Sequence, residues 1–407
     1  MADAMSTLVT PPLALYVHFP WCVRKCPYCD FNSYTLSGPL AETAYIERLL
    51  RDLHAQARSV VGREVVSVFL GGGTPSLFSP EAIGRLLEAT RRELPLAADV
   101  EITLEANPGT IERGMFAEYR AAGITRVSLG AQSFDAQALQ ALGRIHSPDE
   151  TRLAAAELHA AGLANFNLDL MYALPGQDLA GALADVRQAL QLAPAHLSHY
   201  QLTLEPGTAF AAHPPLLPQE DAAAAMHAQC TQLLASAGFA RYEVSAYARA
   251  GARCRHNLNY WNFGDYLGVG AGAHGKLTHP RGADIVRTTQ LREPRRYLAA
   301  ADAALARRSI PRHERPFEFM LNALRLTQGF EREMFCARTG LAWESVAAVL
   351  ERQRQRGLLE ASAAGYRPSA QGLLFLNDLL LEFLPETPKN SGLSVLSMAA
   401  LEVSTGT

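Results

Sequence analysis

Three cysteines stand close together near the N-terminus, in the segment Cys22-Val-Arg-Lys-Cys26-Pro-Tyr-Cys29. Thiolates at these spacings can each hold one iron of a four-iron cubane cluster. Such a cluster normally takes four cysteines, so three local ligands leave one iron open to a small molecule, as a catalytic zinc keeps an open position. The spacing therefore favours an open iron–sulfur site.

Other uses of these cysteines remain open. A closed zinc site would need a fourth ligand, and the nearby histidine is His18, which precedes Cys22 by four positions. A Cys-x-x-Cys redox pair needs only two thiols and leaves Cys22 without a role. The other three cysteines, Cys230, Cys254 and Cys336, are scattered, which fits a reducing compartment better than a disulfide scaffold.

A second motif, Gly71-Gly72-Gly73-Thr74-Pro75, directly follows an apolar run. Three glycines let the backbone approach a ligand closely and expose its N–H groups. The motif matches neither the Rossmann fingerprint nor the P-loop. A tight turn without a ligand is the alternative, but we expect a ligand cradle.

Polar residues Glu105, Gln132 and Asp169 fall at or just past the ends of three predicted strands. In a parallel barrel that face carries the site. Buried carboxylates need partners, and a ribose diol and an amino group would suit Glu105 and Asp169. Ordinary ion pairs with helix residues are the alternative for each residue taken singly.

The segment His256-Asn257-Leu258-Asn259-Tyr260-Trp261 combines an imidazole with an unusual density of aromatic residues. Aromatic walls and an imidazole suit a flat, apolar ligand that carries a metal, such as heme. Aromatic residues that simply anchor a loop are the commoner alternative.

Six short apolar runs between residues 12 and 250 predict the strands that position these residues. The runs are mostly continuous rather than alternating, and helix signals lie between them, which predicts right-handed strand–helix units and a parallel sheet. This number of units suits a barrel at least as well as an open sheet. The predicted strands are residues 13–17, 65–70, 100–106, 126–131, 165–170 and 197–204.

The rest of the chain has a different texture. Residues 251–310 are rich in Gly, Asn and aromatics at their start, and we expect a connecting segment that is irregular over about 250–290. Residues 311–385 predict a mainly helical, winged-helix-like domain with a short hairpin, in which acidic and basic residues balance, so DNA binding is not favoured. Residues 1–11 predict an N-terminal tail, and 386–407 a disordered tail.

Composition restricts the class of protein. Of the 407 residues 48% are hydrophobic and 19% charged, and the net charge of −3 gives no general field for nucleic acid or an anionic membrane. We expect no integral membrane segment, because no apolar run is long enough to span a bilayer. The start, MADAMSTLVTPP, lacks the features of a secretory signal, so we expect a cytoplasmic protein.

Taken together, these motifs resemble a known family. Over about residues 12–385 the chain is similar to the radical S-adenosylmethionine (SAM) enzymes related to oxygen-independent coproporphyrinogen III oxidase, and within that group to the heme chaperones. The segments that carry the resemblance are YVHFPWCVRKCPYCDF, FLGGGTPS, ITLEANPG, VSLGAQSF, LGRIHS, FNLDLMYALPGQ, YQLTLEPGT and HNLNYW.

The resemblance implies a partial (β/α)6 TIM-type barrel of the radical SAM type with a C-terminal mainly helical domain. It implies that Cys22, Cys26 and Cys29 hold a [4Fe–4S] cluster whose open iron binds SAM, which is cleaved to methionine and a 5′-deoxyadenosyl radical once the cluster is reduced. It also implies that HNLNYW contacts heme, with His256 as the first candidate and Asn257, Tyr260 and Trp261 around it. The residues implied to line the SAM region are Tyr16, Tyr28, Gly72, Gly73, Thr74, Glu105, Gln132, Arg144 and Asp169.

One departure separates the two kinds of relative. The oxidase carries a fourth cysteine two positions past the third, where this chain has Phe31, and it has a longer segment before the cysteines. Both differences favour a heme chaperone over an enzyme that decarboxylates coproporphyrinogen III, which stays the alternative. The axial heme ligand is open among His256, Cys254, His146 and His274.

As a chaperone, the protein would pass heme to an apo-hemoprotein, for which the resemblance suggests a respiratory protein at the inner membrane. The chaperone could then lie at the membrane through this acceptor. A homodimer is compatible with the family, although we find no residue that predicts one.

Overall fold

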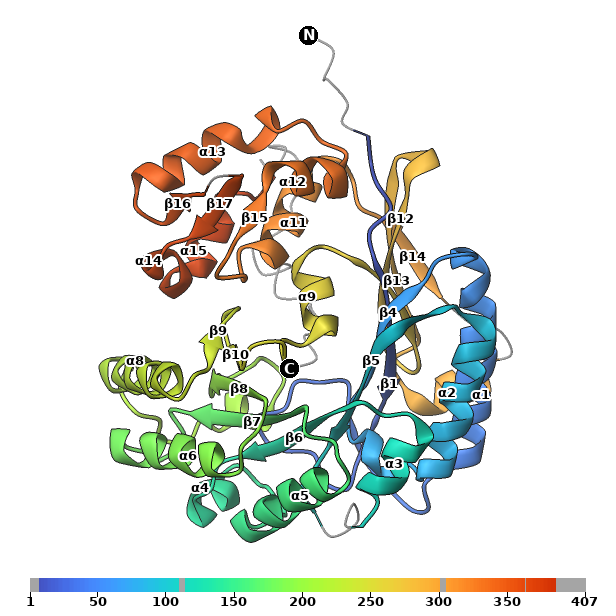
Figure 1. Cartoon of the computed structure of the whole chain (residues 1–407), viewed down its shortest axis with the longest axis vertical. Coiled ribbons are helices and arrows are strands. Elements are labelled where there is room, and N and C mark those ends of the chain that lie inside the picture. Colours follow the sequence, from blue (N-terminus) through green and yellow to red (C-terminus); the bar gives the residue numbers. More distant parts are fainter. Residues whose placement is uncertain (1–6, 110–113, 301–304, 363, 386–407) are drawn as a thin grey trace.

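The computed structural model describes residues 7–109, 114–300, 305–362 and 364–385. Its centre is a curved sheet in which six parallel strands lie in sequence order (Figure 1). All six predicted strands are confirmed, and with them the α/β class and the partial (β/α)6 barrel. These strands are β1 (Leu13–Phe19), β4 (Val65–Gly72), β5 (Leu96–Ala106), β6 (Arg126–Gln132), β7 (Phe166–Tyr172) and β8 (His196–Gln201).

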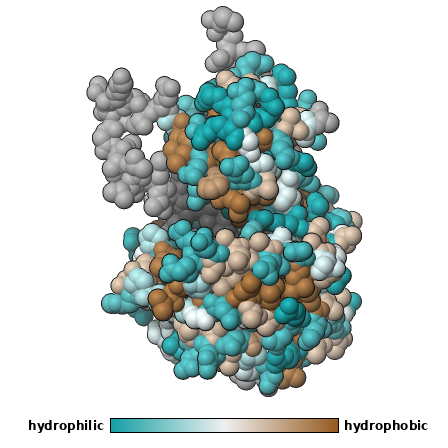
Figure 2. Space-filling model, turned by 90° about the vertical axis from the view of Figure 1, so that its left-hand side faces the viewer, coloured by the Kyte–Doolittle hydropathy of each residue, from teal (hydrophilic) through white to brown (hydrophobic). Residues whose placement is uncertain are grey.

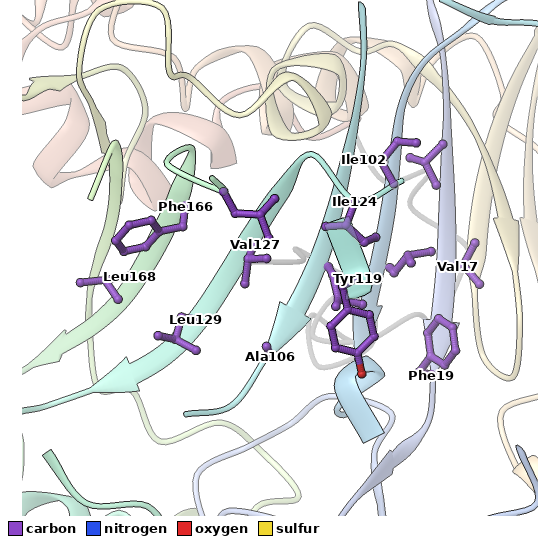
Figure 3. Packing of buried hydrophobic residues seen from close by; sticks show 14 of the residues in the cluster. Val17, Phe19, Ile102, Ala106, Tyr119, Ile124, Val127, Leu129, Phe166 and Leu168 are labelled. Atoms are coloured by element: carbon purple, nitrogen blue, oxygen red, sulfur yellow. The ribbon is translucent and has the colours of Figure 1, made fainter. Parts of the chain in front are cut away.

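Helices cover the outer face of this sheet (Figure 1). Alternate side chains of β6, such as Val127 and Leu129, enter the apolar layer beneath the helices (Figure 3), so the side chains between them face the inside of the barrel. The helices are α1 (Glu42–Ala57), α2 (Pro80–Glu93), α3 (Phe116–Ala122), α4 (Ala136–Ala141), α5 (Pro148–Ala160), α6 (Leu179–Gln191) and α8 (Glu220–Ser236). The short α7 (Ala209–Ala212) lies instead at the cluster loop, where the Phe210 N–H donates to the carbonyl oxygen of Pro27 at 2.9 Å.

The prediction of irregular structure over about 250–290 is wrong. This part forms a helix and strands, and β11 pairs with β1 in parallel, so that it extends the barrel sheet. Its glycines allow strands to pack closely instead of marking a loop. A Cβ on Gly268 of β11 would lie 1.9 Å from the carbonyl oxygen of His274 on β12. The elements are α9 (Arg255–Trp261), β11 (Asp265–Val269), β12 (His274–His279), β13 (Asp284–Thr289), α10 (Pro294–Ala299) and β14 (Ala306–Ser309).

Two short strand pairs complete the barrel part. The loop that carries the cysteines begins in β2 (Trp21–Cys22), which pairs with β3 (Tyr34–Thr35). At the other end of the sheet, β10 (Ala246–Ala248) pairs with β8 and with β9 (Ala240–Arg241). The cluster loop is therefore held at the carboxyl end of β1.

The C-terminal part has the predicted winged-helix order, with the predicted hairpin formed by β16 and β17. Its apolar core is separate from that of the barrel and also takes in Leu8, near the N-terminus. The domain boundaries stay a prediction, and the tail 386–407 lies outside the described residues. The elements are α11 (Arg315–Ala323), β15 (Phe330–Glu331), α12 (Arg332–Thr339), α13 (Glu344–Gln355), β16 (Leu359–Ala361), β17 (Gly365–Pro368), α14 (Ala370–Leu374) and α15 (Leu376–Leu381).

Among the described helices, none combines the length and apolar character needed to cross a bilayer. On the face drawn in Figure 2, hydrophobic residues are interspersed with hydrophilic ones, as on most globular proteins.

Candidate functional site

A pocket of about 370 Å³ opens at the carboxyl ends of the parallel strands, beside the loop that carries the three cysteines. This volume lies in the range of small-molecule sites. The predicted residues that it brings together are Cys22, Cys26, Cys29, Tyr28, Gly72, Gly73, Thr74, Glu105, Gln132, Arg144 and Asp169. Most of the SAM region implied by the resemblance therefore forms one pocket.

The three thiols share this pocket with a half-buried cation, that of Arg144. Arg144 donates to Cys26 Sγ at 3.6 Å and to the carbonyl oxygen of Gly130 at 2.8 Å. Burial is the main cause that raises the pKa of Cys22 to about 11, so a thiolate there needs compensating positive charge. A bound iron cluster would supply that charge, and three thiols on one loop are the donor set that it takes. The residues present thus fit a three-cysteine cluster.

No three His, Cys, Asp or Glu side chains in the described ranges are arranged to hold a single metal ion. The zinc interpretation needs a fourth ligand, and His18 does not provide one here. Its Nδ1 lies 2.9 Å from the Tyr16 hydroxyl and its Nε2 lies 2.9 Å from the carbonyl oxygen of Asn32. Both ring nitrogens are therefore engaged away from the cysteines.

The three glycines lie at the end of β4, and Gly72 and Gly73 line the pocket, so the ligand cradle stays a prediction. Their N–H groups are not all free for a ligand, because Gly72 donates to Glu105 Oε2 at 2.8 Å and Gly73 to the carbonyl oxygen of Phe19 at 2.6 Å. Space also requires glycine at these positions. A Cβ on Gly73 would lie 2.6 Å from the carbonyl oxygen of Trp21, so the glycine lets the cluster loop pack directly on the end of β4.

Two carboxyl groups lie deep in the pocket wall. Burial raises the pKa of Glu105 to about 8, although the Gly72 N–H acts in the opposite direction. Burial also raises the pKa of Asp169, which accepts hydrogen bonds from Asn167 Nδ2 at 2.7 Å and Ser128 Oγ at 3.3 Å. Both groups are placed to accept hydrogen bonds from a bound ligand.

Gln132 marks the end of β6 with a left-handed backbone, at a φ of 65°. This region is uncommon for residues other than glycine, and it occurs preferentially at functional sites. The Tyr200 hydroxyl donates to Gln132 Oε1 at 2.8 Å, which fixes the amide at the pocket wall.

The structure does not bring Tyr16 or the HNLNYW residues into this pocket. Tyr16 lies below it, with its ring stacked on Phe69. His256 is 1% exposed, its Nδ1 lies 3.1 Å from Ser67 Oγ, and its ring stacks on Phe69 and meets Tyr260 edge-on. Asn257 is also buried, as is Trp261, whose ring lies under Arg325 at 4.3 Å. These side chains fill the inside and the base of the barrel.

Several lining residues were missed from the sequence. Ser128 and Tyr200 lie on predicted strands at positions that alternate with the apolar layer, so the strand-end rule applied to β6 and β8 could have found them. Asn107 follows β5, and its Nδ2 donates to Thr74 Oγ1 at 2.9 Å. His146, considered as a heme ligand, also lines the pocket, with Nε2 3.1 Å from the carbonyl oxygen of Ala131.

The chain is similar to known protein families and to named proteins over most of its length. The model of the radical SAM superfamily matches residues 16–189, and that of the HemN C-terminal domain matches residues 310–375. A protein named heme chaperone HemW from Escherichia coli is 49% identical over 92% of this chain and 99% of its own length. One of the same name from Haemophilus influenzae is 47% identical over 92% of this chain and 99% of its own.

A more distant relative is bovine mitochondrial radical S-adenosyl methionine domain-containing protein 1, which is 37% identical over 91% of this chain and 87% of its own length. Among solved structures, the radical SAM enzyme coproporphyrinogen III oxidase (HemN) from E. coli matches with a TM-score of 0.77, over 92% of this chain and 90% of that one. At 22% identity this likeness concerns the fold alone.

Proposed function

The chain belongs to the radical SAM superfamily and, within it, to the family of the HemW heme chaperones, and on this premise we propose that it binds heme and passes it to an apo-hemoprotein. The observation that carries the proposal is the match to these chaperones over nearly the whole of both chains. Membership of the superfamily implies a [4Fe–4S] cluster and SAM.

In this proposal Cys22, Cys26 and Cys29 hold the cluster, which supplies an open iron for SAM and an electron for its cleavage. Arg144 offsets the negative charge that the thiolates bring into a buried pocket. Gly72, Gly73 and Thr74 form the wall beside the cluster loop. The chain's own groups therefore bind and orient the cofactors.

The deeper wall would hold the rest of SAM. Glu105 and Asp169 offer carboxyl groups to a ribose diol and an amino group, and the amide of Gln132 is held ready by Tyr200. Tyr28 lines the pocket from the cluster loop. Tyr16 supports this region from below, through its contact with His18 rather than through the ligand.

For heme, His256 remains our first candidate as iron ligand, with Asn257, Tyr260 and Trp261 around it. Because His256 is 1% exposed, the proposal requires α9 to move before an iron can reach the imidazole. Cys254 is 0% exposed and would need the same movement. His146 lines the cofactor pocket and His274 is partly exposed, so both are alternatives that need no such opening.

The acceptor, its position and the oligomeric state belong to the same proposal. We place the chaperone in the cytoplasm, with a respiratory apo-hemoprotein at the inner membrane as acceptor, and a homodimer as a compatible form. Radical chemistry on coproporphyrinogen III is the second candidate. It is disfavoured by Phe31, which stands where the oxidase has its fourth cysteine.

The test is an anaerobic titration of the cluster-reconstituted protein with hemin, followed in the Soret region. We expect a saturable shift at one heme per chain that weakens in His256→Ala. His279→Ala, at an exposed position outside the barrel, is the control. An unsaturable titration would count against heme binding, and an unchanged affinity in His256→Ala would reassign the ligand. Conversion of coproporphyrinogen III to protoporphyrinogen IX by the same anaerobic protein, supplied with SAM and a reductant, would establish the second candidate instead.

A further inference from the structure

Among the described residues, a buried arginine inside the barrel, Arg126, makes no hydrogen bond and has an Nε without an acceptor. Arg126 is the first residue of β6, is 2% exposed, and faces the inside of the barrel, since its neighbour Val127 enters the outer apolar layer. Within the described ranges its guanidinium makes no hydrogen bond or ion pair, and its Nε is a buried donor without an acceptor. Nearby carboxylates favour its charge, but a buried N–H without an acceptor costs free energy, so the open Nε points to an acceptor that arrives from outside.

The two carboxylates that face Arg126 are engaged elsewhere. Glu101 Oε1 accepts from the backbone N–H of Arg255 at 2.9 Å and from Cys254 Sγ at 3.5 Å. Asp169 accepts from the neutral donors of Asn167 and Ser128. Both lie near enough to Arg126 to act on it electrostatically but form no ion pair with it. The Nε donor of the guanidinium therefore remains available.

Two more buried polar atoms without partners lie next to this arginine. Thr103 is the register partner of Arg126 on β5, and its Oγ1 is unpaired. His256 is near enough for the charge of Arg126 to act on its imidazole, and its Nε2 is also unpaired. The guanidinium from β6, the Thr103 hydroxyl from β5 and the His256 imidazole from α9 thus lie near one another without forming hydrogen bonds among themselves.

This group of atoms lies directly below the cofactor pocket. Ser128, whose side chain lines the pocket, is two residues further along β6 on the same face, which is a separation of about 6.6 Å along the strand. Asp169 also lines the pocket and lies within electrostatic reach of Arg126. A ligand that enters the barrel past these residues would meet the guanidinium.

We propose that Arg126 recognises a carboxylate of the heme cargo inside the barrel. Heme carries two propionate groups, and a guanidinium binds a carboxylate through two parallel, charge-assisted hydrogen bonds. Thr103 Oγ1 is placed to donate to the same group, and His256 Nε2 would reach the iron once α9 moves. The inference rests on the proposed function and adds to it the side chain that selects the free acid form of the cargo.

The test compares hemin with hemin dimethyl ester, in which both propionates are masked, by Soret titration of wild type and Arg126→Met. We expect wild type to prefer hemin about tenfold or more, because a charge-assisted pair is lost in the ester. Arg126→Met should bind the two ligands equally, with the affinity for hemin reduced to that for the ester. Arg249→Met, which removes an exposed arginine packed on Phe239, should keep the wild-type preference.

Stability in urea separates recognition from a structural role. If Arg126 is held for a ligand, Arg126→Met without heme should unfold at nearly the same urea concentration as wild type, because no hydrogen bond of the guanidinium is lost. A lower midpoint together with an unchanged preference for hemin would assign Arg126 to the fold and overturn the inference.

The wild-type comparison needs no variant and separates the two proposals. Equal binding of hemin and its ester by wild type overturns the inference while heme binding stands. Absence of saturable binding for either ligand overturns both.

Discussion

At the scale of single residues, contact between the cluster loop and the barrel depends on positions that tolerate no side chain. Gly73 donates to the carbonyl oxygen of Phe19 and faces the backbone of Trp21. Backbone atoms cannot give way as the end of a side chain can. Close backbone packing therefore holds the loop, together with side-chain hydrogen bonds such as those from Asn32 Nδ2 to the carbonyl oxygens of Ala271 and Arg292, both at 3.0 Å.

This packing predicts a severe effect of Gly73→Ala. The new Cβ would lie 2.6 Å from the carbonyl oxygen of Trp21 and 2.8 Å from that of Phe19, so the loop must shift. We expect a loss of about 1–3 kcal/mol in the free energy of unfolding and reduced iron incorporation on reconstitution. Urea denaturation and iron analysis measure the two effects.

Gly84→Ala is the matched control, because Gly84 lies within α2 and its Cβ would meet only the Cβ of Ala122, at 3.6 Å. It should leave iron binding unchanged and raise stability by about 0.5–1 kcal/mol. Normal iron incorporation by Gly73→Ala would show that the loop does not depend on this contact.

The buried imidazole of His256 predicts a pH dependence of stability. Burial, with a smaller effect of Arg126, lowers its pKa from 6.5 to about 3. Between these values the unfolded chain binds a proton that the folded chain does not, so the free energy of unfolding falls as pH drops below about 6.5. One such group contributes a slope of at most about 1.4 kcal/mol per pH unit.

His256→Asn should therefore flatten the pH profile of stability between about pH 6 and pH 4, measured by urea denaturation at several pH values. His213→Asn, at an exposed position, should leave the slope as in wild type. Identical slopes for wild type and His256→Asn would mean that the imidazole is not held neutral by burial.

At the scale of elements, α9 is fixed by a residue distant in sequence. No side chain caps its start locally, and the carboxylate of Glu101 on β5 accepts from the backbone N–H groups of Arg255 and His256 at 2.9 and 3.4 Å. A carboxylate at a helix start also interacts favourably with the helix dipole. Glu101 thus holds the element that carries the candidate heme ligand.

Removing this cap should loosen α9 without unfolding the barrel. For Glu101→Ala we expect a loss of about 1–3 kcal/mol in the free energy of unfolding, since buried N–H groups lose their acceptor. Hydrogen exchange of residues 255–261 should become faster than in wild type. Asp99→Ala is the control, because it removes an exposed ion pair in which the side chains of Asp99 and Arg255 are 73% and 46% exposed. It should change the free energy of unfolding by no more than about 0.5 kcal/mol. Unchanged exchange in Glu101→Ala would refute the capping role.

The same elements show what a sequence can predict. The six parallel strands follow from continuous apolar runs, and the cluster loop from the spacing of its cysteines, because both patterns are local. The position of α9 does not follow, because its cap, Glu101, is 154 residues away from Arg255. Arg126 was not recognised for a similar reason, since a single arginine at the start of a strand looks like an exposed end until the fold closes over it.

At the scale of the whole molecule, two apolar cores meet through the strands that extend the barrel. Phe263 lies just after α9, and Ile285 lies on β13. Both belong to the apolar core of the C-terminal part rather than to that of the barrel. Leu8 joins the same core from the N-terminal side. In Figure 1 the C-terminal part accordingly lies beside α9, so that movement of that helix would be felt by both parts.

This arrangement predicts that the residues before β1 stabilise the C-terminal part. Leu8 is 4% exposed, and the next backbone N–H, of Val9, donates to the carbonyl oxygen of Ala337 at 2.8 Å. We expect Leu8→Ala to lower the free energy of unfolding by about 2 kcal/mol, whereas Val9→Ala, at a side chain 49% exposed, should change it by less than about 0.5 kcal/mol. Equal effects would show that this segment is not anchored.

The central claim is that the protein carries heme and gives it up to an acceptor. The direct measurement is to load the cluster-reconstituted protein with hemin anaerobically, remove the free hemin, mix the protein with a heme-free apo-hemoprotein, and follow the Soret spectrum of the acceptor. We expect the acceptor to gain heme in step with its loss from the chaperone, faster than from an equal amount of albumin-bound hemin. Retention of all heme by the loaded protein, with no gain by the acceptor, would contradict the account.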